Sequence, residues 1–319
     1  MVSFNKIGII GAGSYGTALA QCFSKMAEQV LLVSDMEIIT SNINDLHMNL
    51  TVLSGVSLNM NISCTNTFSY IQDSDLIFIA VPMSAVSSVF KQIKEHQIRI
   101  PMVLCSKGFD IENGRLQSDL FEEILDNDYA ILSGPSFAIE IAQGLPAEVN
   151  IASKNSKLSR EIAKSLSSVM FKIEAINDHI GLQVAGALKN VLAIGCGILS
   201  GLNLGNSAIA KLIVNGLREM SELAVVLGGK KETFFELGGI GDVVLTCTSK
   251  QSRNVLFGEH LAKEGNIDNW NGRLVEGVST ANVIPIFERN YNVNMKIFSE
   301  IYKVIHNKKS LFETISKII

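Results

Sequence analysis

Three glycines near the start of the chain have the spacing of a turn that binds phosphate through backbone N–H groups. Gly11, Gly13 and Gly16 form the pattern GxGxxG, which follows an apolar run at residues 6–10 and opens the helix-compatible stretch 17–20. The first glycine permits the tight turn, the second lets the backbone approach a pyrophosphate, and the third allows close packing of helix on strand. The phosphates then lie at the positive end of the helix dipole. The pattern predicts a dinucleotide site; the alternative is a glycine-rich turn without a ligand.

An acidic residue follows at the distance where such folds hold the adenosine ribose. Asp35 lies 19 positions after Gly16, close to the usual spacing of about 20. A carboxylate there accepts hydrogen bonds from the ribose and repels the 2′-phosphate of NADP, and no arginine occurs between residues 26 and 98 to compensate. The position therefore favours NAD. In the alternative interpretation, Asp35 caps a helix that starts at residue 36.

One lysine interrupts an otherwise apolar stretch in the second half of the chain. Lys189 lies within GALKNVLAIG at residues 186–195. Burial of an ammonium group costs several kcal/mol unless the group is paired. On helical spacing Gly186, Ala193 and Cys196 share the face of this lysine, and their small side chains leave room for a ligand. We predict a functional lysine; the alternative is a lysine whose stem carries the charge out to solvent.

A second polar interruption follows the glycines at residues 238–241. Asp242 and Thr246 are spaced i, i+4 and would share one helix face. Asp242 is either the N-cap of a helix or the partner that keeps Lys189 charged and oriented. The spacing leaves both alternatives open.

Two further cationic positions could bind an anion. Ser252, Arg253 and Asn254 stand at the start of a helix-compatible stretch, where a guanidinium group and backbone N–H donors together suit a phosphate. Lys107 follows a strand-like run at the carboxyl end, where α/β sheets present ligands. For both cations the alternative is a side chain solvated at the surface.

The elements that must position these residues divide the chain into two parts. In the first part short apolar runs alternate with helical patterns, which is typical of a doubly wound Rossmann-like α/β domain with a parallel sheet. The predicted strands are 6–11, 29–34, 75–81, 101–106, 129–132, 147–152 and 171–176, and the predicted helices are 14–27, 84–96, 115–126 and 156–169. The last of these helices has Ile162, Leu166 and Val169 at helical spacing.

The second part shows helical patterns only. The segments are 182–200, 206–228, 252–263, 276–289 and 293–305. We therefore predict a dinucleotide-binding domain at residues 1–180 and an all-α substrate-binding and catalytic domain at residues 181–319.

Composition and charge exclude several classes of protein. With 47% hydrophobic residues, 18% charged residues and a mean hydropathy of +0.28, the chain is not intrinsically disordered. The net charge of −4 offers no basic excess for nucleic acid. Residues 181–319 hold 15 Lys and Arg against 12 Asp and Glu, whereas residues 1–180 hold 12 against 19, so an anion site is expected in the second part.

Cysteine spacing and apolar run length bear on compartment, metals and membranes. The five cysteines are scattered without a CxxC pair, so we expect free thiols in a reducing compartment and no metal site. The longest uninterrupted apolar run, at residues 191–199, is half of what a bilayer requires. We expect a cytoplasmic protein without stable membrane insertion. Three glycines within residues 11–16 argue against a signal peptide at residues 6–20.

Taken in order, these motifs resemble those of one enzyme family. The chain resembles NAD(P)-dependent glycerol-3-phosphate dehydrogenase of the bacterial type from about residue 6 to 285. The resemblance is carried by GAGSYGTALA (11–20), AVP (80–82), SKG (106–108), GPSFA (134–138), ALKNV (187–191), GIGDVVLTCT (239–248), SRN (252–254) and VEG (275–277).

The resemblance implies an activity and a set of residue roles. The enzyme would interconvert dihydroxyacetone phosphate and sn-glycerol 3-phosphate with NAD or NADP and so feed glycerophospholipid synthesis. Lys189 would be the proton donor, with Lys107 assisting, while Asp242, Asn190 and Thr246 position the lysine. The residues implied at the cofactor are Gly11, Gly13, Ser14, Tyr15, Gly16, Asp35, Lys107, Ser136, Ala138, Arg253, Val275 and Glu276. Those implied at the substrate, with Arg253 and Asn254 on its phosphate, are Lys107, Gly134, Ser136, Lys189, Asp242, Ser252, Arg253 and Asn254.

The chain departs from this family at the end of the second predicted strand. Many members of this family carry arginine or histidine near the end of the second strand, where this chain has Ser34 and Asp35, which puts the usual preference for NADPH in doubt. The alternative functions are a related two-domain dehydrogenase of the β-hydroxyacid or 6-phosphogluconate type, and a nicotinamide-binding sensor without catalysis. As a further partner we expect a second copy of the chain in a homodimer.

Overall fold

The chain forms two compact units. One short segment from the first half of the sequence, Lys107–Leu116, belongs to the second unit. The computed structural model describes residues 4–265, 270, 272, 274–306 and 313. The first unit contains the described residues up to Ser106 together with Gln117–His179, and the second contains Lys107–Leu116 together with the described residues from Ile180 onward. We predicted a single boundary at residue 180, so the inclusion of Lys107–Leu116 in the second unit is a difference from that prediction.

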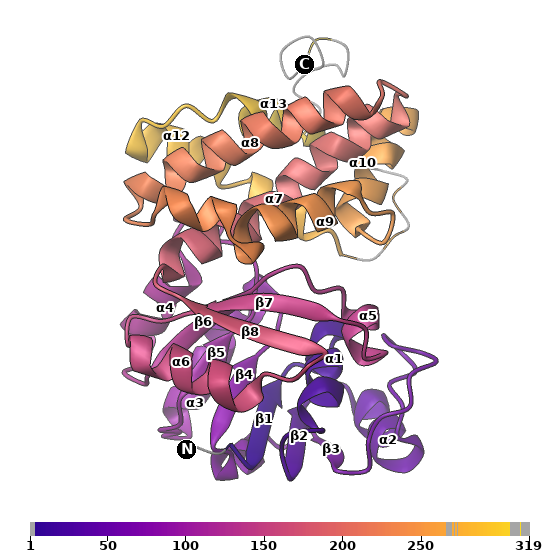
Figure 1. Ribbon diagram of the computed structural model, residues 1–319, viewed down its shortest axis with the longest axis vertical. Helices are drawn as coiled ribbons and strands as arrows, with labels where there is room; N and C mark the ends of the chain where they lie inside the picture. The colour runs from indigo at the N-terminus through magenta and orange to yellow at the C-terminus, as the bar shows by residue number, and fades with distance from the viewer. Residues whose placement is uncertain (1–3, 266–269, 271, 273, 307–312, 314–319) are drawn as a thin grey trace. The chain divides into compact units, whose positions relative to one another are not determined.

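The first unit is built on an eight-stranded sheet with the strand order β3-β2-β1-β4-β5-β6-β7-β8 (Figure 1). All neighbouring strands are parallel except β6 and β7, which are antiparallel. The strands are β1 (Lys6–Ile10), β2 (Gln29–Val33), β3 (Ile62–Thr65), β4 (Leu76–Ile79), β5 (Met102–Leu104), β6 (Tyr129–Ser133), β7 (Ala147–Ala152) and β8 (Phe171–Ile176). The predicted Rossmann-like α/β domain is confirmed. Strand β3 was not predicted, because its residues ISCT carry only a short and partly polar pattern.

The helices of the first unit connect these strands. They are α1 (Ser14–Phe23), α2 (Glu37–Leu46), α3 (Met83–Glu95), α4 (Gln117–Ile124), α5 (Ala138–Ala142) and α6 (Ser156–Leu166), with a 3₁₀ turn η1 (Phe68–Asp73). One buried cluster joins strands of the sheet to α1, α2, α5 and α6, whereas the buried residues of α3 and α4 lie outside it. Helix α6 ends at Leu166, and Val169 lies beyond it with 88% of its surface exposed, so the prediction that Val169 continues the apolar face was wrong.

In the described residues from Ile180 onward, the regular elements of the second unit are all helices. Its elements are α7 (His179–Gly201), α8 (Asn206–Val226), η2 (Lys231–Phe235), η3 (Leu237–Gly241), α9 (Asp242–Thr248), α10 (Arg253–Glu264), α11 (Glu276–Ala281), α12 (Ile284–Tyr291) and α13 (Lys296–Ile305). The predicted helix at 276–289 is two helices, because Pro285 lacks an N–H and begins a new first turn. The prediction of an all-α second part is otherwise confirmed.

Helix α7 is the central element of this unit. Every residue from Gly181 to Leu199 is buried. By length and composition α7 is apolar enough to cross a bilayer, but it is enclosed by the rest of its unit, as the core helix of a globular domain is. The backbone of α10 approaches it so closely that a Cβ on Gly197 would lie 2.1 Å from the Val255 carbonyl oxygen, and one on Gly258 would lie 2.1 Å from that of Ile194.

The predicted free thiols are all found. The five cysteines are unpaired and buried. Among the described residues no group of three or more His, Cys, Asp or Glu side chains is arranged to hold a metal ion.

Candidate active site

The glycine-rich turn between β1 and α1 has the geometry of a phosphate cradle. Gly11 has a φ of +105°, which disfavours a side chain, and a Cβ on Gly16 would lie 1.9 Å from the Gly11 carbonyl oxygen. Gly13 is the N-cap of α1 with no side-chain cap, and a Cβ built on it meets nothing within 4 Å. The first turn of α1 thus presents backbone N–H donors to open space, which fits the pyrophosphate of a dinucleotide.

Asp35 follows the end of β2, as expected for a residue that binds ribose. The residue is exposed. Helix α2 begins at Glu37, and its N-cap is Met36 with no side-chain cap, so the alternative that Asp35 caps this helix is wrong. Hydrogen bonds fix the backbone on both sides of Asp35. Asn66 Nδ2 donates to the Ser34 carbonyl oxygen at 2.9 Å, and the Met36 N–H donates to Ser34 Oγ at 3.1 Å.

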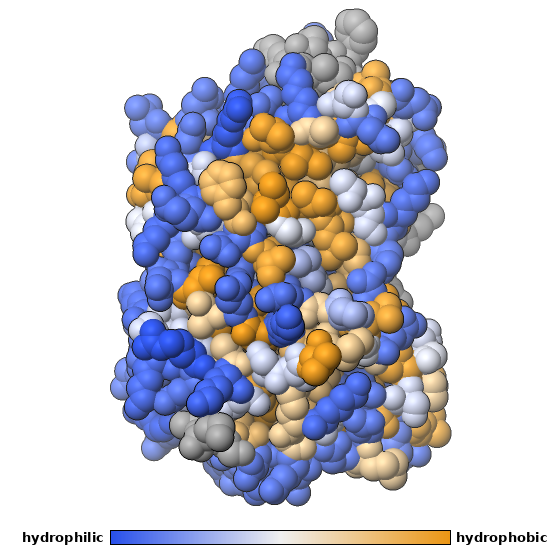
Figure 2. All heavy atoms as spheres, in the orientation of Figure 1, coloured by the Kyte–Doolittle hydropathy of each residue, from blue (hydrophilic) through white to orange (hydrophobic). Residues whose placement is uncertain are grey.

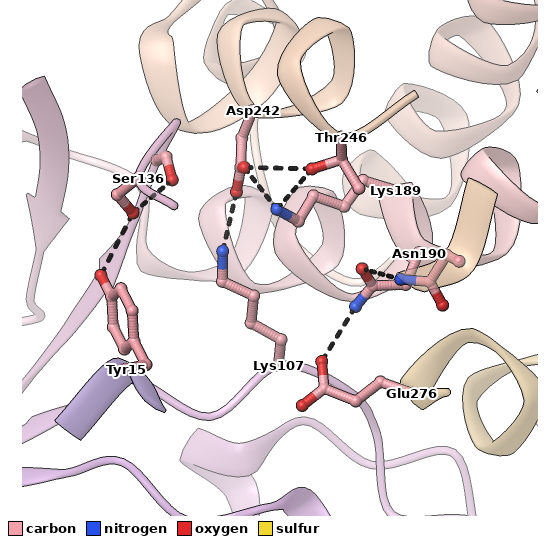
Figure 3. A network of polar contacts seen from close by, with 10 residues as sticks. Tyr15, Lys107, Ser136, Lys189, Asn190, Asp242, Thr246 and Glu276 are labelled. Atoms are coloured by element: carbon pink, nitrogen blue, oxygen red, sulfur yellow. Dashed lines mark hydrogen bonds and ion pairs between the residues drawn. The ribbon is translucent and has the colours of Figure 1, made fainter. Parts of the chain in front are cut away.

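Four more positions that the resemblance assigned to the ligands lie in the first unit. Tyr15 Oη and Ser136 Oγ are 3.3 Å apart, and Ser136 Oγ donates to the Gly134 carbonyl oxygen at 2.9 Å (Figure 3). Close packing alone explains a glycine at position 134, because a Cβ there would lie 2.7 Å from Val149 Cα. Ser14 Oγ donates to the Val52 carbonyl oxygen at 3.2 Å. Ala138 begins α5, which packs against α1.

In the second unit, two lysines share one buried aspartate (Figure 3). Lys189 Nζ donates to Asp242 Oδ1 and, at 2.8 Å, to Thr246 Oγ1. Lys107 Nζ donates to the other oxygen, Asp242 Oδ2, at 2.9 Å. Lys189 is 6% exposed and Asp242 only 1%. The alternative of a lysine that reaches solvent is therefore wrong for Lys189, and Lys107 is paired rather than freely solvated.

The glycines before Asp242 explain how it reaches this position. Residues Leu237–Gly241 form η3, a π-helical turn, and a Cβ on Gly239 would lie 2.2 Å from the Thr233 carbonyl oxygen. This turn packs on η2 and leads directly into α9, whose first residue is Asp242. The N-cap of α9 is Gly241, so between the two alternatives for Asp242 the structure favours the partner of Lys189.

The segment that carries Lys107 is held in the second unit by an aromatic contact. The rings of Phe109 and Phe287 meet edge to face with centroids 4.9 Å apart, and Phe109 is 1% exposed. Gly114, with a φ of +70°, also lies against the Phe287 ring. This anchor was not predicted, because its only signal in the sequence is an apolar residue two positions after the lysine.

The charged groups of this cluster shift the pKa values of Lys189 and Asp242. Burial is the main cause that lowers the pKa of Lys189 to about 8; the Asp242 carboxylate opposes the fall and the Lys107 ammonium adds to it. Burial alone would raise the pKa of Asp242, but Lys107 and Lys189 outweigh it and hold that pKa below its usual value. With one carboxylate and two ammonium groups, the protonated cluster carries a net positive charge.

The small residues on the face of Lys189 serve helix packing, not ligand space. Ala193 and Cys196 lie in the hydrophobic core of the unit. Cys196 shares a hydrogen bond with Cys247, and burial followed by this contact raises the pKa of the Cys247 thiol. At Ala193 and Cys196 the expectation of room for a ligand was wrong, because both side chains are buried in this core.

A second polar group surrounds the residue after Lys189. Asn190 Oδ1 accepts from Asn254 Nδ2 at 2.9 Å, and Asn190 Nδ2 donates to Glu276 Oε2 at 3.3 Å. Asn254 Oδ1 accepts from the Gly277 N–H at 3.0 Å. In the described part of the chain, the Asn190 amide has no hydrogen bond to the Lys189 amine, so Asp242 and Thr246 alone of the three expected residues hold that amine directly.

The expected phosphate-binding tripeptide begins α10, as predicted. Ser252 is the N-cap, and its Oγ accepts from the Val255 N–H at 3.4 Å. Arg253 is exposed, and its Nη1 donates to the Leu274 carbonyl oxygen at 2.9 Å, which leaves the rest of the guanidinium group available to a ligand. Val275, the N-cap of α11, is buried.

Both units together have the features of a nicotinamide-nucleotide-dependent dehydrogenase, with a Rossmann-like unit and a helical unit that holds a buried lysine. Residues 6–159 match the N-terminal part, and residues 178–316 the C-terminal part, of the family described as NAD-dependent glycerol-3-phosphate dehydrogenase. The chain belongs to this family and is an oxidoreductase.

Individual relatives are similar to this chain over nearly its whole length. The chain is 36% identical to glycerol-3-phosphate dehydrogenase [NAD(P)+] of Caulobacter vibrioides, with 100% of this chain and 98% of the relative covered. It is 37% identical to the enzyme of the same name from Zymomonas mobilis, over 96% of this chain and 90% of the relative. The crystal structure of glycerol-3-phosphate dehydrogenase from Coxiella burnetii matches with a TM-score of 0.92 at 31% identity, covering 99% and 98% of the two chains.

Proposed function

We propose that this chain interconverts dihydroxyacetone phosphate and sn-glycerol 3-phosphate with NAD or NADP, and that Lys189 is its acid and base. The observation that carries the proposal is the buried lysine held by Asp242 and Thr246, with Lys107 on the same carboxylate. The family match supports this substrate over β-hydroxyacids and 6-phosphogluconate. The match also favours an enzyme over a sensor without catalysis.

The cluster suits the proton transfer that ketone reduction requires. The dinucleotide, held by Gly11, Gly13 and Gly16, supplies the hydride when it is bound. Negative charge then develops on the carbonyl oxygen of the ketone, where the Lys189 ammonium stabilises it and donates a proton to give the alcohol. In the reverse direction the neutral amine accepts that proton. A pKa near 8 suits both directions at neutral pH.

Asp242 and Lys107 keep the amine ready for this task. Asp242 stabilises the protonated form of Lys189 and fixes the position of Nζ, and Thr246 accepts a further hydrogen bond. The Lys107 ammonium keeps the net charge of the cluster positive, which favours an anionic substrate and a developing alkoxide. We infer that Lys107 assists by this charge.

For the substrate phosphate we propose Arg253 and the first turn of α10. The exposed guanidinium group and the backbone N–H donors at this helix start form a site that suits a phosphate dianion. Ser252 contributes by capping the helix. Asn254 offers its backbone N–H, because both ends of its side-chain amide are engaged within the protein.

The role in the cell follows from the product. We infer that the protein supplies sn-glycerol 3-phosphate for glycerophospholipids and works in the cytoplasm, which five free and buried thiols support.

We infer that the protein is a homodimer. Exposed apolar side chains lie on α8, at the end of η2 and on α9, and Figure 2 shows orange surface in the helical unit. They include Val214 (49% exposed), Phe235 (83%) and Val244 (44%). Patches of this kind mark contact surfaces. Light scattering after gel filtration is expected to give twice the mass of the chain, and Val214→Glu should reduce it to that of one chain; a monomeric wild-type protein would overturn the inference.

The decisive experiment measures the absorbance of reduced nicotinamide with purified protein. We expect turnover with dihydroxyacetone phosphate and none with 3-hydroxy acids or 6-phosphogluconate tested in the oxidative direction. Turnover of a hydroxy acid alone would support the related dehydrogenase. A protein that binds NADH without turning over any of these compounds would support the sensor.

A further inference from the structure

Three helices of the second unit are joined by a closed ring of hydrogen bonds beside Lys189. The ring runs from the Gly277 N–H to Asn254 Oδ1, from Asn254 Nδ2 to Asn190 Oδ1, and from Asn190 Nδ2 to Glu276 Oε2, at 3.0, 2.9 and 3.3 Å. The peptide bond between Glu276 and Gly277 closes it. Asn190 is 4% exposed and Asn254 is 8% exposed, so these amides depend on one another for their partners. Figure 3 shows the link between Asn190 and Glu276.

The Gly277 N–H and the Glu276 carboxylate determine which way each amide of the ring faces. A backbone N–H only donates, so Asn254 must turn its oxygen to Gly277 and its Nδ2 to Asn190. The oxygen of Asn190 is then occupied, and its Nδ2 must face outward to the carboxylate of Glu276, which only accepts when ionised. The polarity of the Asn190 amide is therefore set by Asn254.

Gly277 ties the ring to the backbone of α7. A Cβ at this position would lie 2.6 Å from the Asn190 carbonyl oxygen and 2.8 Å from Asn254 Oδ1. The first turn of α11 thus lies directly on the helix that carries Lys189, one residue from the lysine. This close approach gives a physical reason for the glycine of the VEG motif.

We propose that Asn254 is a positioning residue that fixes the Asn190 amide as a hydrogen-bond donor and so holds Glu276 in place beside the reaction centre. The inference rests on the proposed function, in which Lys189 is the acid and base. Asn190 follows Lys189 directly on α7, and the resemblance implies that Glu276 contacts the cofactor. It differs from a direct grip of the Asn254 side chain on the substrate phosphate, since that side chain has its oxygen and its nitrogen committed to the ring. One hydrogen of Asn190 Nδ2 is directed to Glu276, and the other is left for a ligand.

A reversal of the ring provides the test. In Asn254→Asp, one carboxylate oxygen still accepts from the Gly277 N–H, but the second oxygen requires a donor. The Asn190 amide therefore turns its Nδ2 toward residue 254. The Asn190 oxygen then faces the Glu276 carboxylate. In Glu276→Gln, the side-chain oxygen still accepts from Asn190. In the double variant Asn254→Asp with Glu276→Gln, the turned Asn190 oxygen accepts from the Gln amide, and the ring closes again with the opposite polarity. Asn282→Asp, an exposed change on the C-cap of α11, is the matched control.

Stability and turnover are expected to separate in these variants. Asn254→Asp should lower Tm by several degrees and kcat at least tenfold, because two acceptors then oppose each other. The double variant should recover the Tm but not the kcat, since Asn190 then presents an oxygen where the site needs an N–H. Glu276→Gln and Asn282→Asp should keep the wild-type Tm. Recovery of both Tm and kcat would reduce the ring to a structural role, and a double variant no more stable than Asn254→Asp would refute the amide polarity.

A substrate without phosphate separates the inference from a phosphate grip. For the uncharged variant Asn254→Ala, which adds no charge beside the proposed phosphate site, the positioning role predicts that kcat/KM falls by the same factor for dihydroxyacetone as for dihydroxyacetone phosphate. A loss confined to the phosphorylated substrate would overturn the positioning role. The proposed function itself is judged by wild-type turnover, so its failure is distinguishable from failure of this inference.

Discussion

The two candidate sites of this chain are built in opposite ways. In the first unit the cofactor turn is made of backbone, and its requirements are the absence of a Cβ at Gly11 and Gly16 and open space at Gly13. In the second unit the acid–base cluster is made of side chains, and Lys107 meets Asp242 across 135 residues of sequence. A backbone site depends on local conformation, whereas a side-chain cluster depends on how distant helices pack.

This difference predicts different consequences of mutation. A change in the cluster should act on the chemical step, because its charges matter most when charge develops on the substrate. A change in the turn should act on cofactor binding. Variants in each site test this difference.

The largest effect is expected at Lys189. Lys189→Met keeps the length and apolar stem of the side chain but removes the proton, so kcat should fall about a thousandfold. The dissociation constant for NADH, measured by fluorescence titration, should change less than threefold, because the cofactor turn is in the other unit. Lys263→Met, an exposed change on α10, is the control. Equal losses in kcat and in cofactor affinity would remove the division between the two sites.

The next effect concerns the counter-ion. Asp242→Asn leaves two ammonium groups close together without a carboxylate, so the pKa of Lys189 should fall below its value of about 8. Reduction requires protonated Lys189, so the wild-type rate should decline as the pH rises through about 8, and the variant should decline at lower pH. We expect kcat at pH 7 to fall about a hundredfold. A rate profile with an unchanged alkaline limb would contradict the assignment of Lys189 as the acid.

The same division explains what the sequence could predict. The turn is local, because a strand, three glycines and a helix are contiguous, and its geometry agrees with the pattern. Lys189 was also predicted, since a lysine in an apolar helix needs a partner. The partner itself stayed open between two roles for Asp242, because an N-cap and an ion-pair partner look alike without the packing of α7 against α9.

The features that sequence analysis missed all depend on long-range contacts. The segment that carries Lys107 joins the second unit through Phe109 on Phe287, a contact across more than 170 residues. Strand β3 exists because β2 pairs with it, although its own pattern is short. The small residues beside Lys189 were misread, because close helix packing and ligand space require the same small side chains.

A matched pair of glycine variants probes the backbone site. In Gly16→Ala the new Cβ would lie 1.9 Å from the Gly11 carbonyl oxygen, so Tm should fall by several degrees and NADH binding should weaken with it. Gly13 has an extended backbone conformation and open space, so Gly13→Ala should keep Tm within about one degree. Its methyl group occupies the cradle, and the dissociation constant for NADH should rise about tenfold. An unchanged affinity in Gly13→Ala would show that phosphate does not lie against this turn.

The smallest effect concerns the choice of cofactor. Asp35 is exposed at the end of β2, so Asp35→Ser should fold normally while it loses the charged acceptor for the ribose and the repulsion of a 2′-phosphate. We expect the wild-type protein to use NADH at least as well as NADPH, and the variant to shift the ratio of kcat/KM values about tenfold toward NADPH. Asp45→Ser, an exposed change on α2, should leave the ratio unchanged. The side chain at this position, unlike the glycines, acts by charge, so a wild-type protein that prefers NADPH tenfold or more would show that the carboxylate points away from the ribose.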